Sequence, residues 1–450
     1  DNREYPLASH YTFATMEKVM HYVWRHRLWN NPSMETVDGR RVTVIDPGQP
    51  NNGSGPDFFN AKVRIDGELW AGNVEIHVRA SDWYRHGHDS DPAYDSVILH
   101  VVDADDAPVE RPVSGGRIPQ VRMPCVADFA SRYSRLVGNA STELPCAGEI
   151  ASMSSLHISD WISALAHERI IGKAERITEL LGRFCGDWEE TAYVTFARAL
   201  GRGINGQAME QLALATPLRL LRKHSDSTVA LEAMLFGQAG MLEKEAADDP
   251  YYATLQREYA FYRTKFGLRQ PKAIVWRTSG MRPQSFPHRR VALLAAMISG
   301  GFSLLSKLLE SENPEDIMRL FQAELSPYWQ TRYTFGAVAG RPSPPLGRGA
   351  MQSLVINVAV PLIYAYGSVV RDPKAEQRQD HAFGLLEQIP SEENNIVSLF
   401  VKEGVVCRDA FTSQALIQLR RVYCEPRKCL YCRIGHRLLS RRAMRPVISD

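Results

Sequence analysis

Apolar and polar residues alternate with a period of two over much of the first 130 residues, which is the spacing of β-strands. The alternating runs are "RVTVIDPG", "AKVRIDG", "ELWAGNVEIHVRA" and "SVILHVVD", and residues that favour turns separate them. Ahead of these runs, "TMEKVMHYVWRHRLW" has apolar residues at helical spacing and predicts a helix near 15–29. A helix followed by strands predicts a compact α/β domain over residues 16–130.

From about Leu156 the apolar period changes to three and four positions, beginning with "SDWISALAHERIIGKAERITELLGRF". Further helices are predicted at 187–201, 206–223, 227–244, 249–266, 289–309, 314–323, 350–366 and 409–423. The breaker run "GRPSPPLGRG" predicts a boundary between a helical domain, 150–340, and a helical C-terminal lobe, 350–450. The predicted fold class is an α/β N-terminal domain followed by a mostly α-helical region.

Two of the strand runs form a predicted hairpin, "GPDFFNAKVRIDGELWAGNVEIHVRASDW", from residue 55 to residue 83. Asp66-Gly67 is a strong turn signal between them, because both residues tolerate the left-handed conformation. Side chains on a strand alternate between its faces, so Glu75 and His77 share one face. The hairpin is expected to bring Asp57 back toward Glu75.

"GPDFFNAKVRIDG" followed by "GNVEIHV" resembles the core of the PD-(D/E)xK nuclease superfamily, whose motif is Pro-Asp on one strand and an acidic residue two positions before a lysine on the next. The resemblance implies a restriction-endonuclease-like mixed sheet, with Asp57 and Glu75 holding Mg²⁺ or Mn²⁺. His77 would stand at the lysine position, and Glu17 on the first helix would be an outer acidic ligand. From "MEKVMHYVWRHRLW" to "YCEPRKCLYCRIGH", the chain is also similar to an uncharacterised bacterial family of unknown function.

This chemistry suits the residues at the hairpin. Phosphodiester hydrolysis needs hard oxygen ligands for a divalent ion, a metal-bound water of lowered pKa and a cation near the phosphate. Asp57 and Glu75 meet the first need. Histidine is only partly charged at neutral pH, unlike lysine. His77 could therefore be a different general base, an additional metal ligand, or a sign that the domain kept the fold and lost the reaction.

A second ionisable cluster lies in "DWYRHGHDSDPAYDSVILH". Its His-Gly-His and nearby aspartates could extend the metal site or hold a substrate phosphate, and His88 and His100 are the preferred candidates. The alternative for the aspartates is a polar connector in which they cap turns. His100 lies inside "VILHVV", where a hydrogen-bonded core histidine is the alternative.

The loop "VWRTSGMRPQSFPHRR" interleaves arginines with aromatic residues, which suits a nucleic-acid backbone and unstacked bases. The predicted nucleic-acid-binding residues are Trp276, Arg277, Arg282, Arg289 and Arg290. The alternative is a structural loop in which the arginines pair with acidic residues and the tryptophan fills the core.

The tail "YCEPRKCLYCRIGHRLLSRR" has the spacing of a metal site, with Cys424, Cys429, Cys432 and His436 as predicted ligands. Zinc is the simplest occupant. Cys407 is an alternative fourth ligand, and an all-cysteine set would suit an iron–sulfur cluster, which some nucleases of the resembled superfamily carry. Reduced cysteines packed near a helix end are the alternative to any metal site.

Composition bounds the function classes without choosing among them. The chain has 450 residues, 44% hydrophobic residues and a net charge of +2, so affinity for nucleic acid would need a local basic patch. No apolar run approaches the ~20 residues of a membrane span, and three of the seven cysteines crowd into nine positions, which favours a metal site in a reducing compartment, so we predict a cytoplasmic protein without membrane contact. Residues 1–15 lack periodicity and are expected to be an extension. The sequence thus predicts a metal-dependent nuclease-like enzyme, with a non-catalytic scaffold that binds nucleic acid or protein partners as the alternative.

Overall fold

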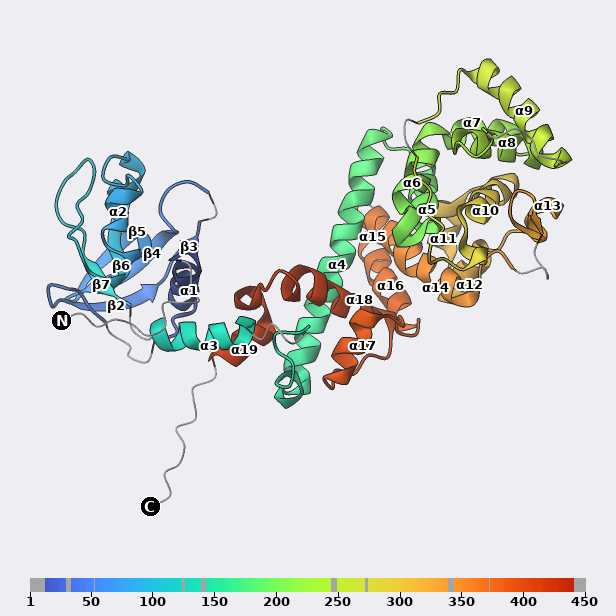
Figure 1. The fold of residues 1–450 in the computed structure, drawn as a ribbon. Coiled ribbons are helices and arrows are strands. Elements are labelled where there is room, and N and C mark those ends of the chain that lie inside the picture. The colour runs from blue at the N-terminus through green and yellow to red at the C-terminus, as the bar shows by residue number, and fades with distance from the viewer. Residues whose placement is uncertain are drawn as a thin grey trace. The chain divides into compact units, whose positions relative to one another are not determined.

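The computed structural model describes residues 13–29, 34–51, 53–123, 126–138, 143–243, 249–271, 274–338, 344–371 and 373–440. The chain forms two compact units (Figure 1). The α/β unit contains the chain up to Ile158 together with the segment from Arg420 onward, and the helical unit is Ser159–Leu419.

The α/β unit is built on a mixed sheet, in agreement with the predicted fold class. Its strands lie in the order β1-β2-β4-β5-β6-β7, and β3 pairs with β4. Neighbours from β1 to β5 are antiparallel, whereas β5, β6 and β7 run parallel. The elements are α1 (Phe13–His26), β1 (Met34–Glu35), β2 (Arg41–Asp46), β3 (Gln49–Pro50), β4 (Phe58–Ile65), β5 (Glu68–Arg79), α2 (Asp82–Arg85), β6 (Val97–Ala104), β7 (Gln120–Arg122) and α3 (Val126–Gly138).

The β4–β5 hairpin forms at the predicted turn, where Asp66 and Gly67 have φ of 47° and 91°. On the second half of β5, residues 74 to 78 are all buried, because α1 packs on this strand and β4 and β6 flank it. Glu75 is therefore in the interior, where it pairs in register with His100 of β6. The face of β5 that carries Glu75 and His77 is therefore buried.

The C-terminal segment returns to the α/β unit. The π-helix Leu419–Cys424 leads into a 3-10 turn, Cys429–Tyr431, and then α19 (Arg433–Ser440). Tyr22 of α1 hydrogen-bonds His436, and the Arg132 guanidinium on α3 donates to the Leu439 carbonyl at 2.6 Å. The predicted range 350–450 is thus divided between the two units.

The helical unit follows the predicted helical periodicity over most of its length. Its elements are α4 (Ser155–Arg183), α5 (Trp188–Leu200), α6 (Arg202–Ala215), α7 (Leu218–Leu221), α8 (Thr228–Gln238), α9 (Pro250–Phe266), α10 (Pro287–Ser299), α11 (Leu304–Glu310), α12 (Pro314–Leu320), α13 (Pro327–Gln330), β8 (Arg332–Thr334), β9 (Ala337–Val338), α14 (Arg348–Leu354), α15 (Val360–Val369), α16 (Ala375–Glu387), α17 (Asn395–Lys402) and α18 (Ala410–Gln418).

Breakers divide two of the predicted helices. The range 206–223 contains α6 and α7, separated at Pro217, and the range 289–309 contains α10 and α11, separated at Gly300 and Gly301. Proline lacks the amide hydrogen that a helix interior needs, and Gly301 adopts a φ of 78° that helices do not use. The helices α3, α16 and α17 were not predicted.

One hydrophobic core runs through the helical unit, from Ile170 to Ala410. Leu346 of the breaker run belongs to it, as do Leu354 and Ile363 of the helices that follow. Residues before and after 340–349 therefore share one core. The predicted ranges 150–340 and 350–450 place the two sides of this core in different domains.

Among the described residues, the helical stretch Arg348–Val369 is long and apolar enough to cross a membrane by length and composition, and 56% of its most apolar window is buried. A second stretch qualifies only when α10 and α11, which are bent by 76°, are counted together. A buried core helix meets the same criteria, so this is weak evidence for a membrane span.

Candidate metal centre

The predicted hairpin carboxylates lie together in the α/β unit. The Asp57 amide donates to Glu75 Oε2 at 3.0 Å, and the Ile76 amide donates to Asp57 Oδ2 at 3.0 Å. This reciprocal bonding follows from the hairpin register, in which Phe58 is opposite Val74. Asp57 and Glu75 are therefore held beside each other by backbone groups of the two strands.

The first helix adds two ionisable side chains to this pair. His21 Nε2 lies 3.2 Å from Asp57 Oδ2. Glu17, one helical turn earlier, interacts electrostatically with both His21 and Asp57. Sequence reasoning selected Glu17 and missed His21. The i, i+4 spacing of the two residues on one helix was the available signal.

Burial strongly affects the protonation of this group. Burial raises the pKa of Glu75 to about 9, and the negative charge of Asp57 adds to the shift. Burial also raises the pKa of Glu17. The pKa of His21 is raised as well: burial lowers it, but the hydrogen bond to Asp57 and the nearby carboxylates outweigh burial. A cation placed here would relieve the repulsion between the carboxylates, so the donor set fits a divalent metal ion.

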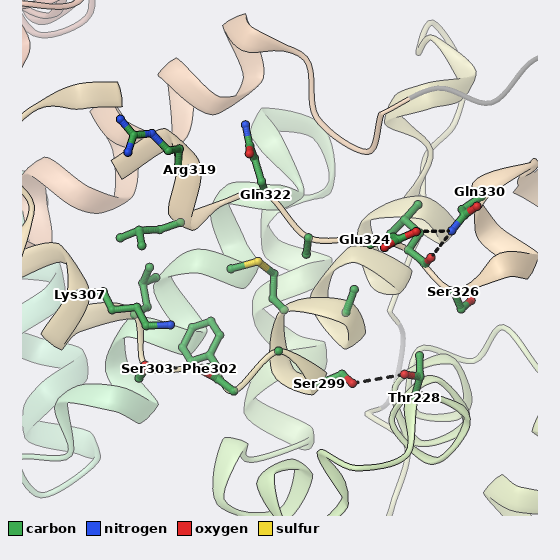
Figure 2. A pocket seen from close by; sticks show the side chains of 18 of the residues that line it. Thr228, Ser299, Phe302, Ser303, Lys307, Arg319, Gln322, Glu324, Ser326 and Gln330 are labelled. Carbon is green, nitrogen blue, oxygen red and sulfur yellow. Dashed lines mark hydrogen bonds between the residues drawn. The ribbon is translucent and has the colours of Figure 1, made fainter. Parts of the chain in front are cut away.

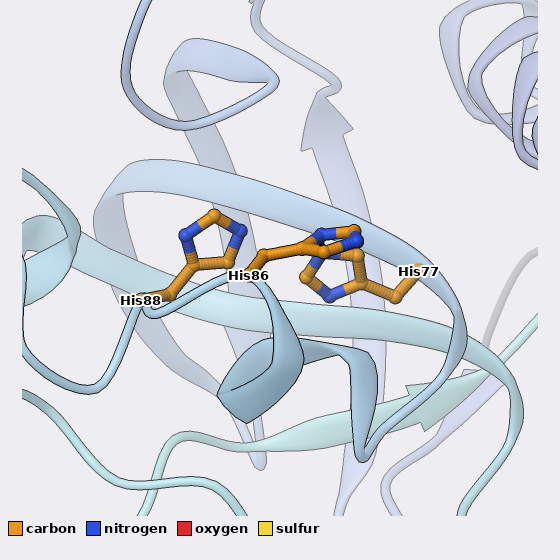
Figure 3. A group of neighbouring side chains, drawn as sticks. All are labelled: His77, His86 and His88. Carbon is orange, nitrogen blue, oxygen red and sulfur yellow. Dashed lines mark hydrogen bonds between the residues drawn. The ribbon is translucent and has the colours of Figure 1, made fainter.

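Three imidazoles, those of His77, His86 and His88, form a cluster (Figure 3). The cluster adjoins Glu75 on its other side. His77 comes from β5, and His86 and His88 come from the turn that follows α2. The His77 Nε2 atom lies 3.2 Å from His86 Nδ1 and 3.5 Å from Glu75 Oε1. His88 Nε2 lies 3.3 Å from the same Glu75 oxygen. One ligand atom from each of the three histidines lies within 4.8 Å of the other two.

His100 supports this cluster from β6. Its Nε2 atom lies 2.9 Å from His77 Nδ1, and its side chain is fully buried. Burial lowers the pKa of His77 to about 2 and that of His100 to about 3, and it also lowers the pKa of His88. These rings are neutral at pH 7, which is the form that binds metals. His77 therefore cannot supply the positive charge of the lysine whose motif position it occupies.

A local turn explains why two histidines so close in sequence reach the same place. Gly87 between them has a φ of 74°, and its amide bonds the Tyr84 carbonyl at 3.1 Å. The His88 amide bonds the Trp83 carbonyl at 3.0 Å, which is the pattern of a helix ending in a left-handed residue. His86 was not among the predicted site residues. The tripeptide His-Gly-His was the available signal.

The predicted nucleic-acid loop lies in the helical unit, and its residues separate into two groups. Arg277 and Arg282 are exposed. Arg289 and Arg290 are buried on the first turn of α10, where Arg290 Nη1 donates to the Pro345 carbonyl at 3.0 Å. Trp276 packs against the core and donates to the Ala239 carbonyl at 2.8 Å. The buried arginines present no surface to a polyanion in this conformation.

The C-terminal cysteines are buried, and so is Cys146, which sequence reasoning did not select. Burial raises the pKa of Cys424 well above its usual value, and Cys146, Cys432 and Cys429 add to the shift in that order. Cys146 therefore lies near Cys424. A guanidinium bond from Arg420 to the Glu143 carbonyl also joins the two segments. Cys146 is marked as a candidate ligand by its burial near Cys424, and the sequence alone did not show that burial.

The two alternative fourth ligands have other surroundings in this structure. Both ring nitrogens of His436 have partners, Tyr22 through Nδ1 and Ser440 through Nε2. Cys407 belongs to the helical unit, where its sulfur lies 3.9 Å from the Asp409 carbonyl oxygen. Among the described residues, the histidine trio meets the 4.8 Å limit and the cysteines do not. A single tetrahedral zinc would need sulfurs only ~3.8 Å apart, given Zn–S bonds of ~2.3 Å.

The described part of the chain has a pocket in each unit. One, of about 610 Å³, lies in the helical unit, and its labelled polar side chains include Lys307, Arg319 and Glu324 (Figure 2). Its described lining contains a single carboxylate and neither histidine nor cysteine, so it offers no cluster of metal ligands. The other, of about 470 Å³, lies in the α/β unit, where α1 and the C-terminal segment line it.

Together, the fold and the site define a two-unit protein whose mixed sheet carries a buried cluster of carboxylates and histidines. A family described as proteins of unknown function, DUF2851, matches residues 17–395, and the chain belongs to this family. The comparisons with curated proteins and with solved structures returned no match. The matched range includes the residues of the histidine–carboxylate cluster and ends before the C-terminal cysteines.

Proposed function

We propose that the α/β unit is a metal-dependent nuclease-like enzyme that hydrolyses phosphodiester bonds of DNA or RNA. The observation that carries the proposal is the reciprocal bonding of Asp57 and Glu75 across the β4–β5 hairpin. The resemblance of this hairpin to PD-(D/E)xK nucleases supports the same activity.

Each residue of the pair has a defined task in this proposal. Asp57 and Glu75, with Glu17 as an outer group, would hold Mg²⁺ or Mn²⁺, which supplies a water of lowered pKa and neutralises charge on the phosphate. His21 keeps Asp57 oriented through their 3.2 Å contact. Because His21 has a raised pKa, it also supplies positive charge near the phosphate, a task that neutral His77 cannot perform.

The pocket of about 470 Å³ offers a path for a polyanion. Its lining includes the exposed cations Lys18, Arg25 and Arg433. His21 lines the same pocket and contacts Asp57, so the pocket adjoins the carboxylates. Cations that line a path to the metal ligands favour a nucleic-acid backbone as the substrate.

The test is hydrolysis of single- and double-stranded DNA and RNA by the full chain with Mg²⁺ or Mn²⁺. Asp57→Asn should abolish cleavage, because it removes the charge that holds the ion, while Asp226→Asn, which alters an exposed aspartate of the helical unit, should leave cleavage unchanged. Activity that survives Asp57→Asn would refute the proposed centre. Wild-type protein that binds nucleic acid without cleaving it would instead support the scaffold, which is the alternative that neutral His77 favours.

We also infer a structural zinc or iron–sulfur cluster at the C-terminal cysteines, whose binding would draw the sulfurs closer together than they lie in this structure. The burial of Cys424, Cys429 and Cys432 in a segment bound to the α/β unit supports it. The nearby Cys146 supports an all-cysteine set in place of His436 or Cys407. Four cysteines can hold either a zinc ion or an iron–sulfur cluster. Visible absorbance distinguishes the coloured cluster from colourless zinc.

A further inference from the structure

We propose that His77, His86 and His88, together with Glu75, bind a transition-metal ion of the Zn²⁺ class. This site is separate from the oxygen ligands of Asp57 and does not depend on the proposed hydrolysis, although Glu75 belongs to both. Glu75 can serve both because its two oxygens face different partners, Oε2 toward the Asp57 amide and Oε1 toward the histidines.

Three of the six separations among these four groups are close to those around a tetrahedral ion, and metal binding would have to bring Glu75 closer, because among the described residues the three histidines, without Glu75, place one ligand atom each within 4.8 Å of one another. Zinc bonds of ~2.0–2.1 Å to nitrogen or oxygen place two tetrahedral ligand atoms ~3.3–3.4 Å apart. The measured separations are 3.2 Å between His77 and His86, 3.5 Å between His77 and Glu75, and 3.3 Å between His88 and Glu75. Each lies within a few tenths of an ångström of the required edge.

The residues around the cluster hold two of the rings in place. His100 Nε2 can accept the Nδ1 proton of His77, which leaves the lone pair on His77 Nε2 directed at the ion. Tyr94 stacks on His88 with ring centroids 3.8 Å apart and an interplanar angle of 21°. His77 and His88 are buried, and His86 is exposed, so His86 is the ligand that closes the site from the solvent side.

The donor atoms decide the class of ion. Three imidazoles and one carboxylate suit Zn²⁺, Co²⁺, Ni²⁺ or Fe²⁺, whereas Mg²⁺ and Ca²⁺ require oxygen ligands. The proposed occupant is therefore a borderline-soft divalent ion and not the Mg²⁺ expected beside Asp57.

The experiment titrates Co²⁺ into full-length protein stripped of metal and follows the visible ligand-field absorption. Wild type should bind one equivalent at the histidines with the intense absorption of a tetrahedral site, in addition to any cobalt at the cysteines, which sulfur charge-transfer bands identify. His86→Ala should weaken this binding by more than about tenfold, a loss at least as large as outer-shell changes cause. Because His86 is exposed, its removal leaves the core intact, and circular dichroism verifies the fold.

Three controls make the result specific. His157→Ala removes an exposed histidine far along the chain and should leave the titration unchanged. Asp57→Asn should abolish hydrolysis but retain the Co²⁺ absorption, so failure of the proposed function is distinguishable from failure of this site. Cobalt bound at the cysteines shows sulfur charge transfer and persists in His86→Ala. Equal affinity and equal spectra in wild type and His86→Ala would overturn the proposal.

Discussion

At the scale of single residues, Glu75 stands out as a buried carboxylate with a raised pKa. It is 4% exposed, it lies beside Asp57, and three hydrogen-bond or ionic partners surround its oxygens. Because burial and Asp57 outweigh the favourable charge of His21, a proton or a metal ion is needed to balance the charge of Glu75. The environment of this one carboxylate therefore links metal binding to pH.

We predict that Glu75→Gln stabilises the metal-free protein at alkaline pH. The folded-state pKa of about 9 exceeds the usual value of 4.5, so the unfolded chain releases this proton first as the pH rises. The wild-type free energy of unfolding should fall through the window from pH 4.5 to about 9, and Glu75→Gln should remove that fall. The difference at pH 8.5 should be on the order of a few kcal/mol.

Urea unfolding in the presence of a chelator at pH 5 and pH 8.5 measures this effect. The matched control is Glu68→Gln, which alters an exposed glutamate of the same strand and should leave the pH dependence unchanged. Added metal should stabilise the wild type more at pH 8.5 than at pH 5. Parallel pH profiles for wild type and Glu75→Gln would contradict the raised pKa.

At the scale of elements, the β4–β5 hairpin and the turn after α2 build the site together. The hairpin fixes the carboxylates through backbone bonds, while the short turn delivers His86 and His88. The turn depends on Gly87, whose φ of 74° is costly for residues with a Cβ. No atom other than Ser90 Oγ, at 3.9 Å, comes within 4 Å of a Cβ built there, so the cost is conformational and not steric.

We predict that Gly87→Ala lowers the free energy of unfolding by about 1 kcal/mol, because alanine is strained in the left-handed region. It should also weaken Co²⁺ binding, since a shift of this turn displaces both histidines. Gly87→Asn is the matched control, because asparagine tolerates this conformation. Thermal unfolding and cobalt titration measure both effects, and equal losses in the two variants would contradict the conformational explanation.

At the scale of the whole molecule, the C-terminal segment completes the unit with which the chain begins. α19 contacts α3 and α1, and Arg420 reaches the segment that contains Cys146. The cysteines thus connect parts of the chain that are more than two hundred residues apart in sequence. A metal ion held there would tie the end of the chain to the α/β unit.

We predict that Cys146→Ser removes the metal from the cysteine site and lowers the melting temperature of the α/β unit. A bound structural zinc contributes on the order of 10 kcal/mol to the folding of small zinc-finger peptides, so even partial loss should be visible. Cys407→Ser is the control and should retain both metal and stability. Elemental analysis and absorbance of the purified protein provide the measurement, and a metal content unchanged by Cys146→Ser would exclude Cys146 as a ligand.

Local patterns predicted the elements and the main pair of the site. The period-two runs gave the strands and Asp66-Gly67 gave the hairpin, because alternation and turn preference are properties of neighbouring residues. The convergence of Asp57 and Glu75 followed from the hairpin alone. By contrast, α16 escaped prediction because the packing of Leu385 and Leu386 in the core, more than its periodicity, fixes it.

Only the tertiary structure decided which distant residues join these local elements. His21 meets Asp57 because α1 packs on β5. His77 stays neutral because its packing buries it, and the neighbouring His100 of β6 adds to the effect on its pKa. Arg289 and Arg290 are charged in the sequence, yet the core of the helical unit encloses them. Cys146 approaches Cys424 through the return of the chain to its first unit. Burial, protonation and long-range proximity depend on the whole packing arrangement, so residue spacing alone could not determine them.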